Sequence, residues 1–330
     1  GWLEAAIRAG MNGYWAAAGC ALALVSQLAG AQPAFPVKPV RFIVPFSPGG
    51  GTDAFARTVG AKLTQTWGQQ VFVENRAGAQ GNIGTAAGAK AAPDGYTMTV
   101  AYVGTLAINP HLYKDPGFDP LKEFAAVTRG TLEAWVLVVH PSLPVHSVKE
   151  LAALAKKRPG QLSFASSASG TQLVGELFKM ATGTNIVHIP YKGAGPAVVD
   201  LLAGNVQLAV SDALPAMPHI KSGKLRALAI TSEKRSELTP DIPTFAEGGV
   251  DGLMAVSWWG ILFPAATPKP ILDRMHAEVV KALASPEVKQ KYADLGVTAV
   301  SSSPAEFRAY IQSEMDRWGK LIKEAGIKPQ

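Results

Sequence analysis

A glycine-rich loop between an expected strand and an expected helix is the feature that most constrains this chain of 330 residues. The apolar run Val40–Val44 predicts a buried strand, and the apolar spacing of Ala54–Trp67 predicts a helix. The segment between them, residues 45–53, reads PFSPGGGTD. Glycines let bare backbone N–H groups at the positive end of a helix close on a small anion. The sequence therefore predicts an anion site at this loop.

A dinucleotide site is the main alternative for the same loop. Residues 49–54 match the G-x-G-x-x-G/A pattern, and Glu74 follows the next expected strand, near the position of the ribose-binding acid. However, Pro45 and Pro48 distort an entry that is usually tight, and Asp53 in the first helical turn repels a pyrophosphate. The G-x-x-x-x-G-K-[ST] pattern of a phosphate loop does not occur in the sequence. We therefore expect a small anion.

Two further strand-to-helix turns share the glycine and serine character of the first. Residues 166–171 follow the expected strand Gln161–Phe164, and residues 191–196 end in Pro196, which suits the first position of a helix. Three such turns are what an anion site between two lobes requires. The alternative is that glycine and serine serve here only as turn and cap residues.

Strand-like and helix-like segments alternate along the chain, which favours an α/β fold with mainly parallel sheets. The expected strands are Val40–Val44, Gln70–Val73, Tyr96–Ala101, Val136–Val139, Gln161–Phe164, Asn185–Ile189, Val206–Val210 and Leu225–Ile230. The expected helices are Ala54–Trp67, Ile83–Ala91, Val148–Lys157, Leu173–Ala181, Ala197–Ala203, Ile271–Ala284, Pro286–Leu295 and Ala305–Lys323. No fixed-period repeat and no long Gly/Ser or Pro linker divides the sequence.

The domain boundaries are therefore expected at strands that cross between two lobes. The candidates are Trp135–His140 and Ala255–Phe263, each followed by a proline. This places residues 36–137 and 260–330 in the first lobe and residues 138–259 in the second, with the ligand cleft between them.

The N-terminal residues predict an export signal over residues 1–31. The small and apolar segment Ala16–Ala29 is short for a membrane span, and Ala29-Gly30-Ala31 fits a cleavage site before Gln32. An uncleaved anchor helix, or lipidation at Cys20, are the alternatives. Cys20 is the only cysteine, so the mature chain has no disulfide or thiol chemistry, and we expect a periplasmic protein.

Composition and motifs disfavour most enzymes and nucleic-acid binding. The net charge of +6 comes without a dense basic run interleaved with aromatic residues. No H-E-x-x-H, G-x-S-x-G or S-x-x-K pattern occurs, so we expect no metal and no cofactor. An exported hydrolase that uses a serine of Ser166–Ser169 stays open as an alternative. Asp212 follows an expected strand and is expected on the cleft side, where it either orients water or a ligand donor or only caps a turn. One ring of Trp258 and Trp259 is expected to face the cleft.

At these residues the chain resembles the Bug family, the TctC-like periplasmic solute-binding proteins of tripartite tricarboxylate transporters. The matching segments are PFSPGGGTD (45–53), VENRAGAQGNIGTAAGAKAAPDGYT (73–97), AINPHLY (107–113), YKGAGPAVVDLLAGNVQ (191–207), PDIPTFAEGG (240–249) and PAATPKPI (264–271). The resemblance implies a type II periplasmic binding protein fold, in which two α/β lobes close on a ligand.

The resemblance also implies which residues hold a ligand carboxylate, partly through water. The first-lobe contacts are Phe46, Ser47, Gly49, Gly50, Gly51, Thr52 and Asp53. The second-lobe contacts are Ser166, Ser167, Ser169 and Thr171, with Thr105, Tyr191, Gly193 and Asp212 as further candidates. Ala77, Gln80, Ala168 and Ser211-Asp212 depart from the family's usual pattern. We expect Gln80 and Trp258 to complete the site and tune the ligand.

These features predict a binding protein without covalent chemistry. We expect it to capture a dicarboxylate, a tricarboxylate or an aromatic carboxylate, to close about the two crossing strands, and to deliver the ligand to the membrane subunits of a tripartite tricarboxylate transporter. We expect a monomer that binds no nucleic acid.

Overall fold

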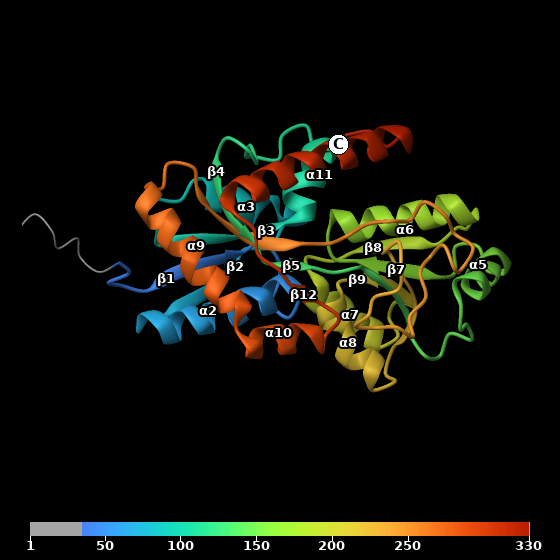
Figure 1. Ribbon diagram of the computed structural model, residues 1–330. Helices are drawn as coiled ribbons and strands as arrows, with labels where there is room; N and C mark the ends of the chain where they lie inside the picture. The colour runs from blue at the N-terminus through green and yellow to red at the C-terminus, as the bar shows by residue number, and fades with distance from the viewer. Residues whose placement is uncertain (1–34, 330) are drawn as a thin grey trace, which may run out of the picture. The chain divides into compact units, whose positions relative to one another are not determined.

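Two five-stranded sheets organise the part of the chain that the structure describes, residues 35–329 of a computed structural model. The expected export signal and Cys20 lie outside these residues. Residues from Pro39 onward form one compact unit, shown in Figure 1. Within residues 35–329, no helix is both long and apolar enough to span a bilayer.

The first sheet is built mainly by the N-terminal third of the chain. Its strands, in spatial order, are β2 (Val71–Asn75), β1 (Val40–Val44), β3 (Thr97–Tyr102), β11 (Trp259–Pro264) and β4 (Phe124–Arg129). β1 runs parallel to both of its neighbours, whereas β11 is antiparallel to β3 and β4. β3 and β11 are buried along their whole length. The continuous apolar sequence of β11 agrees with this, whereas β3 also buries two threonines.

The second sheet has the same plan. Its strands, in spatial order, are β10 (Arg226–Ile230), β6 (Val136–Val139), β9 (Leu208–Ser211), β7 (Ser163–Ser166) and β8 (Val187–Pro190). β7 is parallel to β8 and β9, and β6 is antiparallel to both of its neighbours. One strand in each sheet therefore runs antiparallel to the other four, namely β11 in the first sheet and β6 in the second. Each is the strand by which the chain enters its sheet from the other one.

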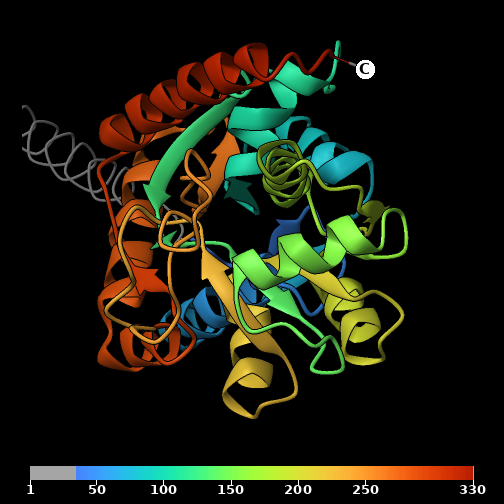
Figure 2. The same ribbon diagram turned by 90° about the vertical axis from the view of Figure 1, so that its right-hand side faces the viewer.

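Helices cover both sheets and begin at the carboxyl ends of the strands. The first lobe carries α2 (Gly51–Trp67), η1 (Ala79–Gly81), α3 (Asn82–Ala89), the π-helical segment η2 (Gly104–Ile108), α4 (Asn109–Leu112), α9 (Lys269–Ala284), α10 (Pro286–Ala293) and α11 (Pro304–Glu324). The second lobe carries α5 (Val148–Lys157), α6 (Ser169–Thr182), α7 (Ala194–Leu202) and α8 (Ala213–Lys221). Figures 1 and 2 show these helices packed around the two sheets.

Two antiparallel segments join the lobes. β5 (Thr131–Leu132) pairs with β12 (Thr298–Ala299), and immediately afterwards Glu133 pairs with Ser257. The Glu133 and Ser257 backbones exchange two hydrogen bonds, of 3.0 and 2.8 Å. The chain enters the second sheet at β6 and returns to the first at β11, close to the expected crossing strands; the boundaries at 137/138 and 259/260 stay predictions.

A buried carboxylate holds α11 against the return strand. The Trp258 side chain is fully buried, and its Nε1 donates a 3.2 Å hydrogen bond to Glu314 Oε2. The same oxygen accepts from Trp318 Nε1, and Arg317 donates to both oxygens of Glu314. Trp258 therefore packs in the first lobe and lies away from the ligand pocket described below, because its polar atom is satisfied by α11.

We predict that Glu314→Ala destabilises the protein by about 2–4 kcal/mol, because two buried indole N–H groups lose their acceptor and each such loss costs about 1–3 kcal/mol. Urea unfolding followed by tryptophan fluorescence measures the loss. Glu314→Gln, which keeps one acceptor oxygen, serves as the control and loses less. A change below about 0.5 kcal/mol for the alanine variant contradicts this account.

Candidate functional site

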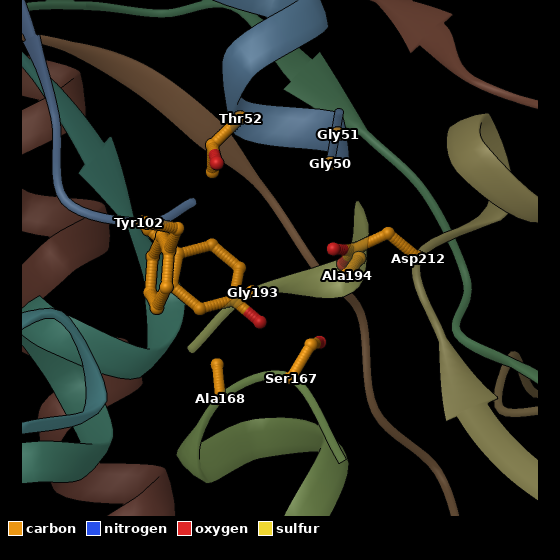
Figure 3. A pocket seen from close by; sticks show the side chains of 10 residues that line it. Gly50, Gly51, Thr52, Tyr102, Ser167, Ala168, Gly193, Ala194 and Asp212 are labelled. Carbon is orange, nitrogen blue, oxygen red and sulfur yellow. The ribbon is translucent and has the colours of Figure 1, made fainter. Parts of the chain in front are cut away.

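A small pocket lies where α2, α6, α7 and α8 begin (Figure 3). It is lined by Phe46, Gly50, Gly51, Thr52, Tyr102, Ser167, Ala168, Gly193, Ala194 and Asp212. The free space between these residues, including the mouth, is about 210 Å³.

Three of the helix starts leave backbone N–H groups free for a ligand. α2 begins after Gly50, α6 after Ala168 and α7 after Gly193, and none of these three cap residues provides a side-chain cap. At α6, Thr171 Oγ1 instead accepts from the backbone N–H groups of Ser167 and Ala168. Because helix starts carry unpaired donors and a positive partial charge, their convergence favours an anion.

Close packing explains why glycines occupy the first helix start. A Cβ on Gly51 would lie 2.4 Å from Cζ2 of Trp259, whose ring is fully buried beneath the loop. Gly193 has a φ of +156° and lies so near Ser47 that a Cβ would be 3.0 Å from the Ser47 nitrogen. Larger residues at either position would push the backbone donors away from the pocket.

Asp53 ties the glycine loop to the sheet. Its carboxylate accepts hydrogen bonds from Gly49 N (3.1 Å), Arg57 Nε (3.0 Å) and Asn75 Nδ2 (3.0 Å). Burial raises the pKa of Asp53, but the bonds from Arg57, Asn75 and Gly49 outweigh it and lower the pKa below its usual value. Asp53 does not line the pocket, and its role in the structure is to set the shape of the loop.

Direct contacts join the two lobes across the pocket. Ser47 N donates a 2.9 Å hydrogen bond to the Lys192 carbonyl, and Gln80 Nε2 donates at 3.1 Å to Gln172 Oε1. Gln80 has a φ of +56°, a strained value that is held in part by Asn109, whose Nδ2 donates to the Gln80 carbonyl. These contacts show a closed cleft.

The fourth wall of the pocket is acidic. Asp212 precedes α8, and its Oδ1 accepts a 2.9 Å hydrogen bond from Trp135 Nε1. Glu133 Oε2 accepts from Ala213 N, which is the first N–H of α8. Burial, with added repulsion from Asp212, raises the pKa of Glu133 well above its usual value, and burial raises the pKa of Asp212 to about 6.

The other predicted site residues lie near the pocket but do not line it. Ser166 Oγ bonds His188 Nε2 at 2.7 Å, and Tyr191 donates to Asp200 at 2.6 Å. Thr105 bonds the Tyr102 carbonyl. The buried hydroxyl of Ser169 lies close to Gly104. The predicted residues that the structure does bring together as lining are Phe46, Gly50, Gly51, Thr52, Ser167, Gly193 and Asp212.

Tyr102, Ala194 and Glu133 belong to the site but are not predicted by the sequence, and Ala168 is predicted only as a departure from the family's pattern. Tyr102 ends β3, so the rule that placed Asp212 at the carboxyl edge of a strand also applied to it. Ala194 is the first residue of a recognised helix start. No sequence pattern predicts Glu133, because it lies in the segment that crosses between the lobes and reaches Ala213 only in the folded protein.

The catalytic and nucleotide alternatives find little support. Burial lowers the pKa of His188, so its Nε2 can accept from Ser166, but among residues 35–329 no acceptor bonds the other ring nitrogen and the pair does not line the pocket. Glu74 is engaged by Arg41 and Arg76, away from any ribose position. Within the same residues, no group of three His, Asp or Glu side chains is placed to hold a metal.

The fold and the pocket define a two-lobe periplasmic binding protein, and comparisons place it further. Residues 55–327 match the model of the tripartite tricarboxylate transporter family receptor. The chain is 40% identical to protein BugT of Bordetella pertussis over 297 residues, which is 89% of this chain and 91% of BugT. The chain belongs to this receptor family.

Solved structures of relatives share the architecture. Rpa4515 of R. palustris, solved with adipate, is 36% identical with a TM-score of 0.86, over 90% of this chain and 100% of that one. MatC of Rhodopseudomonas palustris, solved with malate, is 30% identical with a TM-score of 0.83, over 87% and 100%. The type II periplasmic binding protein fold expected from the sequence is confirmed.

We predict that Gly195→Ala weakens ligand binding at least tenfold without destabilising the free protein. A Cβ on Gly195 would lie 2.2 Å from the Pro48 carbonyl oxygen across the cleft, so the lobes cannot close fully. Alanine otherwise suits a helix interior better than glycine. Calorimetric titration and thermal unfolding measure the two effects. Val199→Ala, at an exposed position of the same helix, is the control; unchanged affinity in Gly195→Ala contradicts the assignment.

The acidic wall predicts a stability that falls with rising pH in the ligand-free protein. The pKa of Asp212 is raised to about 6 in the folded state, so its stabilising proton is fully held below pH 4 and lost as the pH rises through 6. We expect Asp212→Asn to remove a decrease on the order of 2 kcal/mol between pH 4 and 7. Urea unfolding of the unsubstituted protein and of Asp212→Asn at four pH values tests this. If the free energy of unfolding changes with pH in the same way in both proteins, protonation of Asp212 is not coupled to folding.

Proposed function

We propose that this protein captures a small carboxylate in the periplasm and delivers it to the membrane subunits of a tripartite tricarboxylate transporter. The observation that carries the proposal is the convergence of three uncapped helix starts, α2, α6 and α7, on one pocket. Relatives of similar architecture are solved with adipate and malate, both carboxylates, which supports the same ligand class here.

The binding step needs no covalent chemistry. A ligand carboxylate enters between the N–H groups that follow Gly50, Ala168 and Gly193. Each helix start stabilises a negative charge by about 0.3–2 kcal/mol, and each neutral hydrogen bond contributes about 0.5–1.5 kcal/mol. After the costs of ordering the ligand, several such contacts give micromolar affinity, near −8 kcal/mol. The proposed role is therefore that of a receptor and not of an enzyme.

Closure of the two lobes links binding to delivery. The contacts Ser47–Lys192 and Gln80–Gln172 form only when the lobes meet, and the segments that flex are those paired at Glu133 and Ser257. A closed receptor presents a continuous surface across both lobes, which a membrane partner can distinguish from the open form. Export by a signal cleaved near Ala31 would place the protein where such a partner is accessible.

Thermal unfolding with a panel of adipate, succinate, citrate and benzoate tests the proposal, and the corresponding amides serve as uncharged controls. A carboxylate at 100 times its Kd adds about 2.7 kcal/mol of stability, which gives a clear rise in Tm. Gly50→Leu should remove this rise in Tm, because even a Cβ at Gly50 would lie 3.4 Å from Ala194 across the pocket and a leucine would fill the ligand's space. The free protein should stay folded. Chromatography of the incubated ligand checks that it is unchanged.

Two results contradict the proposal. One is that carboxylates and their amides shift the Tm equally, which would show that charge is not recognised. The other is that the panel ligand is converted to a product, which would favour the hydrolase alternative at Ser166–Ser169. Delivery itself is tested by uptake into vesicles that contain the membrane subunits, with and without the loaded receptor.

A further inference from the structure

The start of α8 differs from the three other helix starts at the pocket, because the protein supplies its own carboxylates there. Glu133 Oε2 accepts the Ala213 N–H at 3.0 Å, and Asp212 is the residue before the helix, although its own side chain bonds no N–H group of α8. Asp212 is 5% exposed and lines the pocket, and Figure 3 shows its carboxylate directed into the pocket. This wall therefore presents an acceptor, whereas the walls at α2, α6 and α7 present donors.

A tyrosine hydroxyl lies in the same pocket, and the protein pairs it poorly. Tyr102 is 1% exposed, and although the Trp135 and Ser257 side chains lie near its hydroxyl, neither forms a hydrogen bond of good geometry with it. In Figure 3 the hydroxyl points into the pocket between Gly193 and Ser167. A buried hydroxyl that the protein pairs poorly is stabilised by a ligand group that offers it an acceptor, so this group points to such a ligand.

We propose that Asp212 and Tyr102 together form a subsite for a hydroxyl group, and that the preferred ligand is a short hydroxycarboxylate. This inference rests on the proposed function and names the substrate class within it. The ligand carboxylate lies against the free N–H groups of α2, α6 and α7. The ligand hydroxyl donates its proton to Asp212 and accepts the Tyr102 proton.

The chemistry of the two groups separates three kinds of ligand. A hydroxyl is both donor and acceptor, so it satisfies Asp212 and Tyr102 at once. An ammonium group can donate to Asp212 but offers Tyr102 no lone pair. An unsubstituted carbon chain offers neither group a ligand partner, so Asp212 keeps only its bonds within the protein, such as that from Trp135. A second carboxylate placed at this wall is repelled by the charge of Asp212.

The protonation states at neutral pH fit this assignment. The titratable groups that face Asp212 are Glu133 and Tyr102. With its pKa near 6, Asp212 is ionised at pH 7 and acts as an acceptor. Burial, and then repulsion from Asp212, raises the pKa of Glu133 well above its usual value. Burial, and then the charges of Asp212 and Glu133, raise the pKa of Tyr102, so its hydroxyl remains a donor.

Calorimetric titration with two matched series tests the inference at pH 7.5. The three-carbon series is propionate, L-lactate and L-alanine, and the four-carbon series is succinate, L-malate and L-aspartate. Within at least one series, we expect the hydroxy member to bind at least tenfold more tightly than the unsubstituted member, and more tightly than the amino member.

Two variants assign the preference to the two side chains. Tyr102→Phe should narrow the difference in affinity between the hydroxy and amino members. Because the hydroxyl forms no hydrogen bond of good geometry in the free protein, its removal should lower the Tm of the free protein little. Asp212→Asn, which offers an amide in place of the carboxylate, should bring the hydroxy and unsubstituted members to within about threefold. Asp251→Asn removes an exposed carboxylate that does not line the pocket and should change neither ratio.

The outcomes separate this inference from the proposed function. If carboxylates of both series bind and the hydroxy member has no advantage, the hydroxyl subsite is wrong while the carboxylate receptor stands. A hydroxy preference that persists unchanged in both variants also overturns the subsite. If neither these six compounds nor the earlier panel binds, the proposed function fails, and the inference fails with it.

Discussion

The centre of this protein depends on the backbone N–H groups at helix starts, which have no hydrogen-bond acceptor within their own helix. Every helix leaves its first donors unsatisfied, and four helices of the two lobes begin around one small pocket. Three starts keep these donors free, whereas Glu133 accepts from the fourth. The pocket is thus positive on three sides and negative on one, without a lysine or arginine among its lining residues. Its charge pattern comes from the fold.

The joint between the lobes belongs to the same arrangement. Glu133 pairs with Ser257 through its backbone and with the start of α8 through its side chain. The nearby Trp135 holds Asp212 and packs on Trp318 of α11. A movement of the crossing segments therefore also moves the acidic wall. Hinge and binding site share residues, so the position of Asp212 depends on the relative orientation of the lobes.

Most helices and strands could be predicted from the sequence, because their apolar periodicity is a local property. Val40–Val44, Val136–Val139 and Val148–Lys157 have the bounds expected from their apolar periodicity. α8 was missed because Pro215 and Pro218 within it are typical of turns, and β4 because its apolar run is short. At the site, the glycine loop was predictable from its position between an apolar strand and a helix. Trp258 could not be oriented without knowing that Glu314, 56 residues further on, accepts its N–H.

The bond from Ser47 N to the Lys192 carbonyl joins the lobes through main-chain atoms alone. No side-chain substitution can remove this donor or this acceptor, except a proline at residue 47 that would delete the N–H. This part of the closed form is therefore independent of which side chains line the pocket. Substitutions at Tyr102 or Asp212 leave the main-chain bond between the lobes available, although Asp212 belongs to the wall that moves with the hinge.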